Sequence, residues 1–274
     1  MLSVKEITCK SILSDSGIAP FDYSISPYVG CEHACIYCYA RFMMSFRAGS
    51  EGKQWGEFAN AKINARRVLA RDILKKPKGV TWLSAVTDPY QPIEKKYQLT
   101  RSCLQVLSSH GFPIWVQTKS SLVTRDIDLL SGFAEKDVGF TILTLDDDLR
   151  KRIEPGASPI DERLAALSEL SSKGIQTFAF VGPILPFLSD SKETLKPLIN
   201  ELLKSGVKKI LFDRLNLRWG VWPSIKNFLE KQYPSLLPKY RKVMWGGTDY
   251  FSELKKSING LCKEAKLSNY EVCY

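Results

Sequence analysis

The sequence predicts an α/β fold built on a parallel sheet, and three observations predict it. Short apolar runs rich in β-branched and aromatic residues alternate with stretches of helical periodicity. Strands this apolar, separated by helices, indicate a sheet that is covered on both faces. Six strand–helix units precede residue 217, whereas a closed barrel of this kind has eight. The predicted class is therefore a partial (β/α)6, TIM-like barrel with an irregular or helical C-terminal extension.

The elements follow one another at regular spacing. The predicted strands cover 23–26, 80–86, 112–118, 138–144, 175–181 and 207–212. Helices are expected at 60–74, 100–109, 125–133, 159–173 and 191–204. Thr100 is a candidate N-cap, Pro159 stands at a helix start, and Gly174 and Gly206 follow helix ends. Since chemistry in parallel α/β folds gathers at the carboxyl ends of strands, the residues after each run are the first candidates for a site.

The pattern changes after Asn216. Residues 217–274 contain prolines at 223, 234 and 238 and a Trp-Gly-Gly sequence at 245–247. We therefore expect a barrel domain over 1–216 and an extension over 217–274 that packs on the barrel.

Composition excludes several classes of protein. Hydrophobic residues make up 44% and charged residues 25% of the 274 residues, as in ordinary globular proteins. No apolar run reaches the roughly 18–20 residues that span a bilayer, and Lys5, Glu6 and Lys10 interrupt any signal-peptide core. Seven cysteines include three within eight positions, which indicates metal or redox chemistry rather than disulfides. We expect a cytoplasmic protein without a membrane partner.

The positive charge is unevenly distributed. The net charge is +10, and residues 41–76 hold nine basic and three acidic residues. Residues 201–274 hold fourteen basic and seven acidic residues. Two basic zones favour a polyanionic partner such as nucleic acid. The alternative is a cytosolic protein with a high isoelectric point and no such partner.

The strongest local signal is the cysteine cluster after the first strand. Cys31, Cys35 and Cys38 can converge from one loop on one metal centre, and soft thiolates favour zinc or iron–sulfur. A structural zinc site normally has four ligands, and a passive 4Fe–4S cluster has four cysteines. Three cysteines leave one iron free to bind something else. The alternative is a zinc site with His33 or Cys9 as its fourth ligand.

The Cys-x3-Cys-x-aromatic-Cys pattern resembles the signature of the radical S-adenosylmethionine (radical SAM) superfamily. The resemblance implies a 4Fe–4S cluster on Cys31, Cys35 and Cys38, with SAM chelating the open iron. It also implies cleavage of SAM to methionine and a 5′-deoxyadenosyl radical, an external one-electron donor of flavodoxin or ferredoxin type, and a six-unit partial barrel. That fold agrees with the strand count obtained from the apolar runs.

Further segments resemble one branch of this superfamily, the spore photoproduct lyase-like or "DNA repair photolyase" branch. They stand in order at the predicted strand ends, and the match covers roughly residues 20–216. The segments are 26–31 (Ser-Pro-Tyr-Val-Gly-Cys), 38–41 (Cys-Tyr-Ala-Arg), 87–94 (Thr-Asp-Pro-Tyr-Gln-Pro-Ile-Glu), 117–120 with 125–126, 152–155 and 183–186.

The resemblance also implies contacts to SAM. Tyr37 would meet the adenine edge, and Gly182 and Ile184 would pack the ring, where glycine permits close backbone approach. The other implied contacts are Thr87 and Asp88 to the ammonium, Lys119 with Ser120 to the carboxylate, and Thr144 to the ribose. Ordinary local roles compete with these assignments, because Asp88 can open a turn and Ser120 and Thr144 can cap helices.

The substrate is less defined. In the resembled lyases a cysteine near the end of the second strand returns a hydrogen atom, but residues 84–88 contain none. Tyr39, next to the last cluster cysteine, is the candidate to contact substrate or relay a hydrogen. We expect a radical SAM enzyme, lyase-like or modifying, that acts on nucleic acid or a nucleotide. The alternatives are a small-molecule or protein substrate, and a zinc- or RNA-binding module without catalysis.

Overall fold

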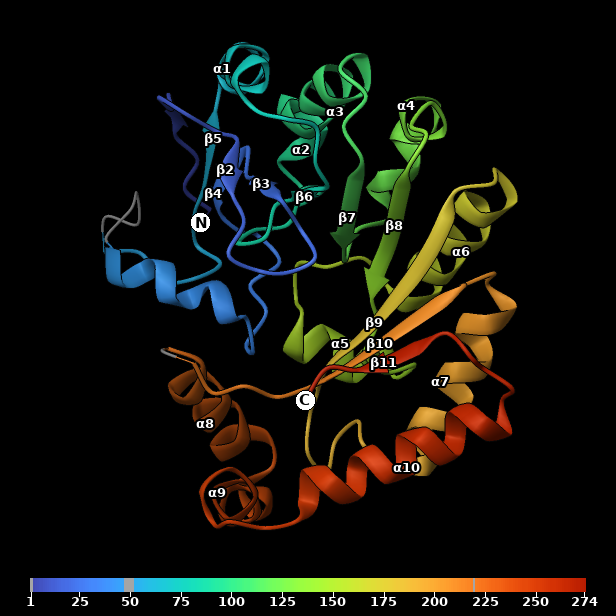
Figure 1. The fold of residues 1–274 in the computed structure, drawn as a ribbon. Coiled ribbons are helices and arrows are strands. Elements are labelled where there is room, and N and C mark those ends of the chain that lie inside the picture. The colour runs from blue at the N-terminus through green and yellow to red at the C-terminus, as the bar shows by residue number, and fades with distance from the viewer. Residues whose placement is uncertain (1, 47–51, 219) are drawn as a thin grey trace.

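The computed structural model describes residues 2–46, 52–218 and 220–274 and contains one large sheet (Figure 1). Its strand order is β11-β10-β9-β8-β7-β6-β3-β2, and the strands from β3 to β11 run parallel. All six predicted strands are present: β3 (Tyr23–Ile25), β6 (Thr81–Leu83), β7 (Ile114–Thr118), β8 (Lys136–Thr141), β9 (Gln176–Ile184) and β10 (Lys209–Arg214). Because β2 (Ser14–Asp15) and β11 (Tyr270–Val272) stand at the two ends of this order, the barrel is partial among the described residues, as predicted.

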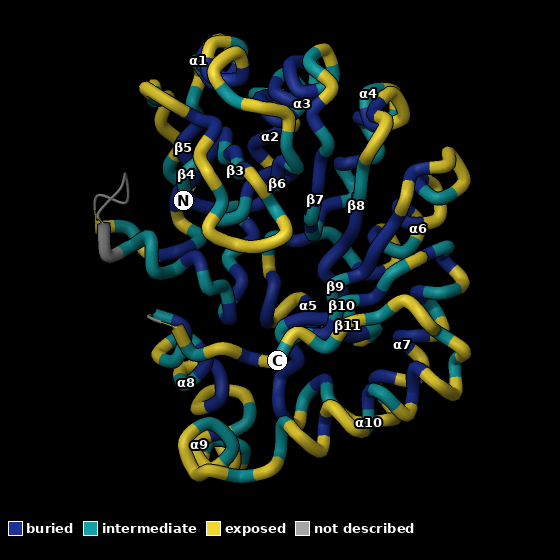
Figure 2. Tube along the Cα trace, in the orientation of Figure 1, coloured by how far each residue is buried: buried dark blue, intermediate teal, exposed yellow. Residues whose placement is uncertain are grey.

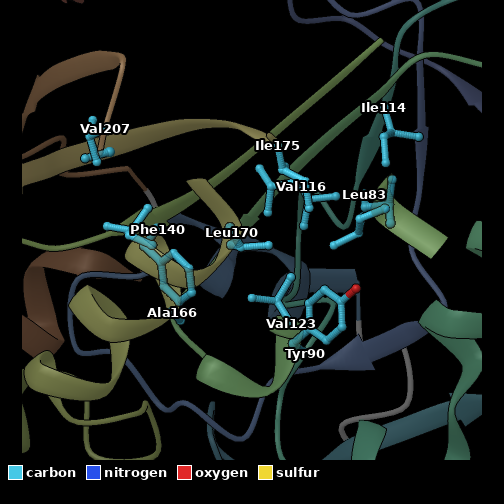
Figure 3. Close-up of a cluster of buried hydrophobic side chains, with 14 of the residues drawn as sticks. Leu83, Tyr90, Ile114, Val116, Val123, Phe140, Ala166, Leu170, Ile175 and Val207 are labelled. Atoms are coloured by element: carbon cyan, nitrogen blue, oxygen red, sulfur yellow. The ribbon is translucent and has the colours of Figure 1, made fainter. Parts of the chain in front are cut away.

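Helices cover the outer side of the curved sheet (Figure 1). They are α1 (Ala65–Asp72), α3 (Leu99–Ser109), α4 (Ile127–Ser131), α6 (Ile160–Ser172) and α7 (Lys192–Lys204). Buried residues follow one another along the strands and recur on the helices that cover them (Figure 2). Val116 on β7, Phe140 on β8 and Leu170 on α6 are fully buried in one cluster (Figure 3). This apolar burial holds the strand ends in fixed positions.

Two local predictions are wrong, for the same physical reason. Residues 60–62 belong to β5 (Ala59–Lys62) rather than to a helix, because this segment pairs with β4 (Tyr28–Gly30) and β1 (Glu6–Ile7) in a second, three-stranded sheet. Thr100 does not cap a helix, because α3 begins one residue earlier and the Thr100 hydroxyl donates to the Pro89 carbonyl at 2.6 Å. In both cases contacts distant in sequence override local preference.

Some element ends also differ from expectation. The strand expected over 80–86 ends at Leu83, because Ser84 adopts a left-handed conformation with φ of 65°. The helix expected over 125–133 is divided between a 3₁₀ helix, η3 (Ser121–Asp126), and α4. Three short elements complete the barrel region: a 3₁₀ helix η1 (Tyr39–Phe46), α2 (Glu94–Tyr97) and α5 (Asp147–Ile153), with η2 (Ile73–Lys75) extending α1.

The segment after residue 220 is mainly helical. It contains α8 (Val221–Gln232), η4 (Pro234–Leu236), α9 (Leu237–Trp245) and α10 (Tyr250–Glu264). Leu254, Ile258 and Leu261 of α10 join the main core, and β11 pairs with β10. Trp219 lies outside the described residues. None of the described helices is long and apolar enough to cross a membrane.

Candidate active site

The cysteine loop leaves the small sheet at Gly30. Gly30 has a φ of 86°, and a Cβ there would lie 2.4 Å from the Phe58 carbonyl oxygen, so glycine is required at this turn. Cys31 and Cys35 are buried and Cys38 is half-buried, and all three carry free thiols. The three cysteines line one cavity of about 80 Å³. The structure therefore brings the predicted cluster ligands together.

The segment after β6 anchors this loop. The Thr87 hydroxyl donates to the Gly30 carbonyl at 2.5 Å, and the Gln91 side-chain amide donates to the Thr87 hydroxyl at 3.0 Å. The Gln91 carbonyl oxygen accepts from the Glu32 backbone N–H at 2.9 Å. Glu32 in turn accepts from the Ile93 N–H at 2.5 Å. Residues 87–94 thus hold the start of the cysteine loop through Gly30 and Glu32.

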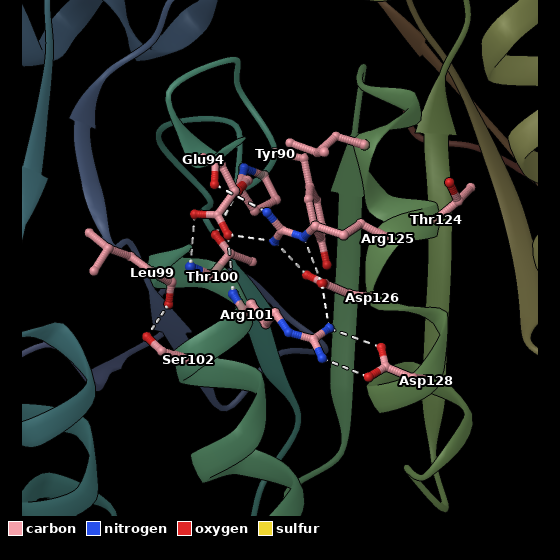
Figure 4. Close-up of polar contacts among 12 residues, drawn as sticks. Tyr90, Glu94, Leu99, Thr100, Arg101, Ser102, Thr124, Arg125, Asp126 and Asp128 are labelled. Carbon is pink, nitrogen blue, oxygen red and sulfur yellow. Dashed lines mark hydrogen bonds and ion pairs between the residues drawn. The ribbon is translucent and has the colours of Figure 1, made fainter. Parts of the chain in front are cut away.

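The far end of the same segment is fixed by a buried ionic network (Figure 4). Glu94 is fully buried and accepts from the Thr100 N–H at 3.0 Å and from the Arg125 guanidinium at 2.8 Å. Asp126, also fully buried, pairs with Arg125 and with Arg101, each at 2.8 Å. These charges satisfy one another and tie α2 and α3 to η3.

Asp88 connects the cysteine loop to the end of β7. Its buried carboxylate accepts from the Thr118 hydroxyl at 2.6 Å and from the Lys119 and Tyr90 backbone N–H groups at 2.9 Å. Its Oδ2 also lies 3.2 Å from Nδ1 of His33. Burial opposes ionisation of Asp88, but His33, Lys119 and the hydrogen bonds outweigh it and hold its pKa well below the ordinary range. Both carboxylate oxygens are therefore engaged by the protein.

His33 and Cys9 were the alternative fourth ligands, and they occupy different places. His33 is 1% exposed and lines the cysteine cavity, and its Nε2 has no hydrogen-bond partner among the described residues. Cys9 lies beside Asn64, whose side-chain oxygen accepts from the Cys9 N–H at 2.9 Å. No three His, Cys, Asp or Glu side chains in the described ranges converge as ligands of a single ion. Cluster thiolates each bind a different iron, so they need not converge in that way.

A second, larger cavity of about 330 Å³ adjoins the first. Cys35, Cys38, Tyr39 and Lys119 line both cavities. The larger cavity is also lined by residues from the carboxyl ends of β8, β9 and β10: Thr141, Gly182 and Asp213. A ligand in the larger cavity would therefore lie beside the cysteine thiols.

Lys119, at the end of β7, is the central cation of the site. Burial disfavours its charged form, but the Cys35 sulfur in its thiolate form and the Asp88 carboxylate outweigh burial and raise its pKa above the ordinary value. Its ammonium forms no ion pair or hydrogen bond within the part of the chain that the structure describes. It is thus free to meet an anionic group of a ligand.

The two tyrosines beside the cysteines have different surroundings. Tyr37 lines the larger cavity and donates its hydroxyl to Glu154, which forms a fully buried ion pair with Arg163 at 2.6 Å. Tyr39 lines both cavities and donates to the Ala85 carbonyl. Burial raises the pKa of Tyr39 to about 12, so its hydroxyl stays protonated at neutral pH.

The remaining predicted SAM contacts divide into two groups. Gly182 lines the larger cavity. Ser120 instead caps η3 by accepting from the Leu122 N–H at 3.3 Å, and Thr144 accepts from the Asp146 N–H at 3.0 Å in the turn before α5. Ile184 is buried in the core. The structure therefore places these last three residues around the site rather than along the cavity wall.

Several cavity residues were missed by sequence reasoning. Thr141 is the last residue of β8, three positions before the predicted Thr144, and strand-end position was the signal that could have identified it. Trp82 and Gln117 alternate with core residues along β6 and β7 and line both cavities. Arg214, the last residue of β10, and Arg218 also line the larger cavity, and no sequence motif around them indicated this.

A comparison with protein-family models agrees with this geometry. The model described as "Radical SAM superfamily" matches residues 25–202, which include the cysteine loop and all the strand ends named above except that of β10. The chain belongs to the radical SAM superfamily. It is a radical SAM enzyme with the partial-barrel fold of that superfamily, and membership implies SAM and a 4Fe–4S cluster as its cofactors.

Individual relatives extend the comparison. An uncharacterized protein of Methanocaldococcus jannaschii is 35% identical over 233 residues, which is 85% of each chain. A protein of Pseudomonas phage M6 named radical SAM Nalpha-GlyT isomerase is 24% identical over 234 residues, covering 83% of this chain and 45% of that protein. A spore photoproduct lyase complexed with dinucleoside spore photoproduct superposes with a TM-score of 0.71 at 19% identity, covering 99% of this chain and 82% of that one. At this identity the structural likeness establishes the fold.

Proposed function

We propose that Cys31, Cys35 and Cys38 hold a 4Fe–4S cluster and that SAM binds in the adjoining larger cavity. The observation that carries this proposal is the junction of two cavities, one lined by three free thiols and both lined by the unpaired Lys119 ammonium. When bound, these groups supply reductive cleavage of SAM to methionine and a 5′-deoxyadenosyl radical that abstracts hydrogen from a substrate. An external electron donor of flavodoxin or ferredoxin type and a cytoplasmic location complete the proposal.

The protein side chains have distinct parts in this site. We assign the Lys119 ammonium to the carboxylate of SAM, since the two charges are complementary. Tyr37 and Gly182 would border the adenine, Gly182 by allowing close backbone approach. Thr87 and Asp88 act mainly by holding the cysteine loop and the β7 end, because their polar atoms are engaged by protein donors and acceptors.

A nucleic acid or nucleotide is the proposed substrate. Two observations support it: the basic composition of residues 41–76 and 201–274, and a fold shared with lyases solved with a dinucleoside photoproduct. Tyr39, at the junction of the two cavities, is the candidate to contact substrate or relay a hydrogen atom. A small-molecule or protein substrate is the competing proposal, in which the basic surface is incidental.

The test is anaerobic reconstitution with iron, sulfide, SAM and a strong reductant. Wild-type protein should contain four irons and four sulfides and release 5′-deoxyadenosine. Cys31→Ala, Cys35→Ala and Cys38→Ala should lose both properties, whereas Cys273→Ala, at an exposed free cysteine outside both cavities, should retain them. One zinc per chain, or SAM cleavage retained without the three cysteines, would refute the cofactor assignment. Faster 5′-deoxyadenosine release with oligonucleotide than with peptide would support the substrate class.

A further inference from the structure

Two arginines line the larger cavity beyond the parts assigned to SAM. Arg214 is the last residue of β10, and Arg218 follows four residues later. Asp213 is the one acid among the described lining residues, against three cations. If Lys119 meets the SAM carboxylate, both arginines remain for another ligand.

Arg214 is held in place by aromatic rings. Its guanidinium carbon lies 4.8 Å from the ring centroid of Phe251 on α10 and 5.7 Å from that of Tyr274, which follows β11. The two rings are themselves 5.9 Å apart in an edge-to-face arrangement. Contact through the faces of a guanidinium leaves the N–H groups along its edge available, and it reduces the freedom lost when a ligand binds.

Neither guanidinium is directly paired with a carboxylate, although the positive charges of both act on the half-buried Asp213. No salt bridge to Arg214 or Arg218 is found in residues 2–46, 52–218 and 220–274, and the Asp213 carboxylate accepts from the Arg214 backbone N–H at 2.8 Å rather than from its side chain. By contrast, Arg101, Arg125 and Arg163 are all paired with carboxylates. Two free forked donors at one cavity match the geometry of an oxyanion.

We propose that Arg214 and Arg218 form an anion-recognition subsite that binds a phosphate group of the substrate. The inference rests on the proposed nucleic-acid or nucleotide substrate and specifies which atoms of the chain recognise it. Phe251 and Tyr274 are positioning residues for Arg214. A phosphate bound here would fix the substrate beside the cavity in which SAM is proposed to lie.

The experiment measures binding to anaerobically reconstituted, SAM-loaded protein. The probes are a fluorescein-labelled single-stranded oligothymidylate, the same oligomer with an uncharged methylphosphonate backbone, and thymidine 5′-monophosphate as competitor. The variants are Arg214→Ala, Arg214→Lys and Arg218→Ala. Lys173→Ala is the matched control, because it removes an equal charge from an exposed position after α6, outside both cavities and both basic zones. Far-UV circular dichroism checks that each variant is folded.

Arg214→Ala and Arg218→Ala should each weaken phosphodiester binding about tenfold or more, since hydrogen bonds to charged groups are among the stronger ones. Arg214→Lys should recover only part of the affinity, because an ammonium lacks the fork. Binding of the uncharged oligomer should change little, and Lys173→Ala should have a much smaller effect on phosphodiester binding. Competition by thymidine 5′-monophosphate would identify a mononucleotide phosphate, and its absence an internucleotide phosphate; either agrees with the subsite.

Two results would overturn the inference. One is unchanged phosphodiester binding in a folded Arg214→Ala, Arg218→Ala double variant. The other is an equal loss for charged and uncharged oligomers. If the wild-type protein holds four irons and cleaves SAM, either result overturns the phosphate subsite but not the proposed cofactor chemistry. If the wild-type protein lacks the cluster or does not cleave SAM, the proposed function itself is refuted.

Discussion

Lys119 stands where a buried strand ends, and this position gives the residue its chemical role. Its backbone N–H is bound by Asp88, so the side chain emerges next to the cysteines and lines both cavities. Within the described chain its ammonium is not directly paired with a carboxylate, and a partly buried charge of this kind favours an anionic ligand.

Lys119→Ala should weaken SAM binding by about tenfold or more while leaving the cluster in place, because the charge lost belongs to the SAM site and not to a cluster ligand. Equilibrium dialysis with labelled SAM measures the affinity, and iron analysis measures the cluster. Lys173→Ala, an exposed lysine beyond α6, is the control. Unchanged SAM affinity would remove Lys119 from the site.

Asp88 is the second residue whose effect extends beyond itself. Asp88→Asn should lower the free energy of unfolding by about 1–3 kcal/mol, because the amide group cannot accept from all the donors that now face the buried carboxylate. Chemical denaturation of the apoprotein measures this. Asp148→Asn, in the exposed first turn of α5, should change stability by less than about 0.5 kcal/mol. Equal stability of the Asp88→Asn and wild-type proteins would show that the hydrogen bonds of the Asp88 carboxylate contribute little to the free energy of unfolding.

The pKa of Asp88 gives this effect a direction with pH. A carboxyl whose pKa is lowered by folding contributes stability above the unfolded pKa of about 4, and the contribution is lost as the pH falls through the folded value. The stability difference between wild-type apoprotein and Asp88→Asn should therefore be largest near neutral pH and shrink below about pH 4. Urea denaturation between pH 7 and pH 3 tests the trend, and a difference that grows on acidification would contradict it.

At the scale of elements, the motif over 87–94 explains why the cysteine loop has a fixed shape. At one end, Thr87 and Gln91 form hydrogen bonds with the cysteine loop. At the other end, Glu94 is fixed by its ion pair with Arg125. Sequence resemblance located this motif, but it suggested ligand contacts for Thr87 and Asp88. The hydrogen bonds of Thr87 to Gly30 and of Asp88 to the end of β7 depend on the fold, because these segments are distant in sequence.

Arg125→Ala should lower the free energy of unfolding by about 3–5 kcal/mol, because it leaves the fully buried Glu94 and Asp126 with one fewer cation. Guanidinium denaturation measures the change. Arg66→Ala, at an exposed position on α1, supplies a variant of matched charge that should be nearly neutral. A loss below about 1 kcal/mol would mean that Arg101 alone satisfies the network.

Element positions could be predicted well where burial decides them and poorly where pairing does. The six parallel strands were correct because their apolar runs need no partner to be recognised. The helix expected from residue 60 was wrong over 60–62, because this segment pairs with two strands that are distant in sequence. The SAM contacts of Thr144 and Ser120 stay predictions, and in the structure both hydroxyls accept local backbone hydrogen bonds, which a polar residue near a strand end forms equally well as a cap.

At the scale of the whole molecule, the cysteine spacing alone identified the superfamily, whereas the arginine pair needed the fold. Arg214 and Arg218 lie about 180 residues from the cysteines in sequence and share a cavity with them because β10 ends at the same side of the sheet as the cysteine loop. β11, α10 and Tyr274 support Arg214 from the last part of the chain. The segment after residue 220 thus contributes both to the sheet and to the cavity wall.

Because the cysteines are enclosed by the folded chain, cluster removal should lower the stability of the whole molecule. In the absence of metal, burial raises the pKa of the Cys35 thiol to about 12, so this thiol is protonated at neutral pH. The metal-free loop therefore lacks the bonds to iron that would link its cysteines. A cluster that binds the native state and not the unfolded state raises the melting temperature, by about 2–4 °C for each kcal/mol in a chain of this size. Scanning calorimetry of reconstituted and chelator-treated protein under anaerobic conditions should show the difference, and Cys31→Ala should melt at the same temperature after either treatment. Equal melting temperatures for the two wild-type samples would mean that the cluster does not brace the fold, or that it binds outside this loop.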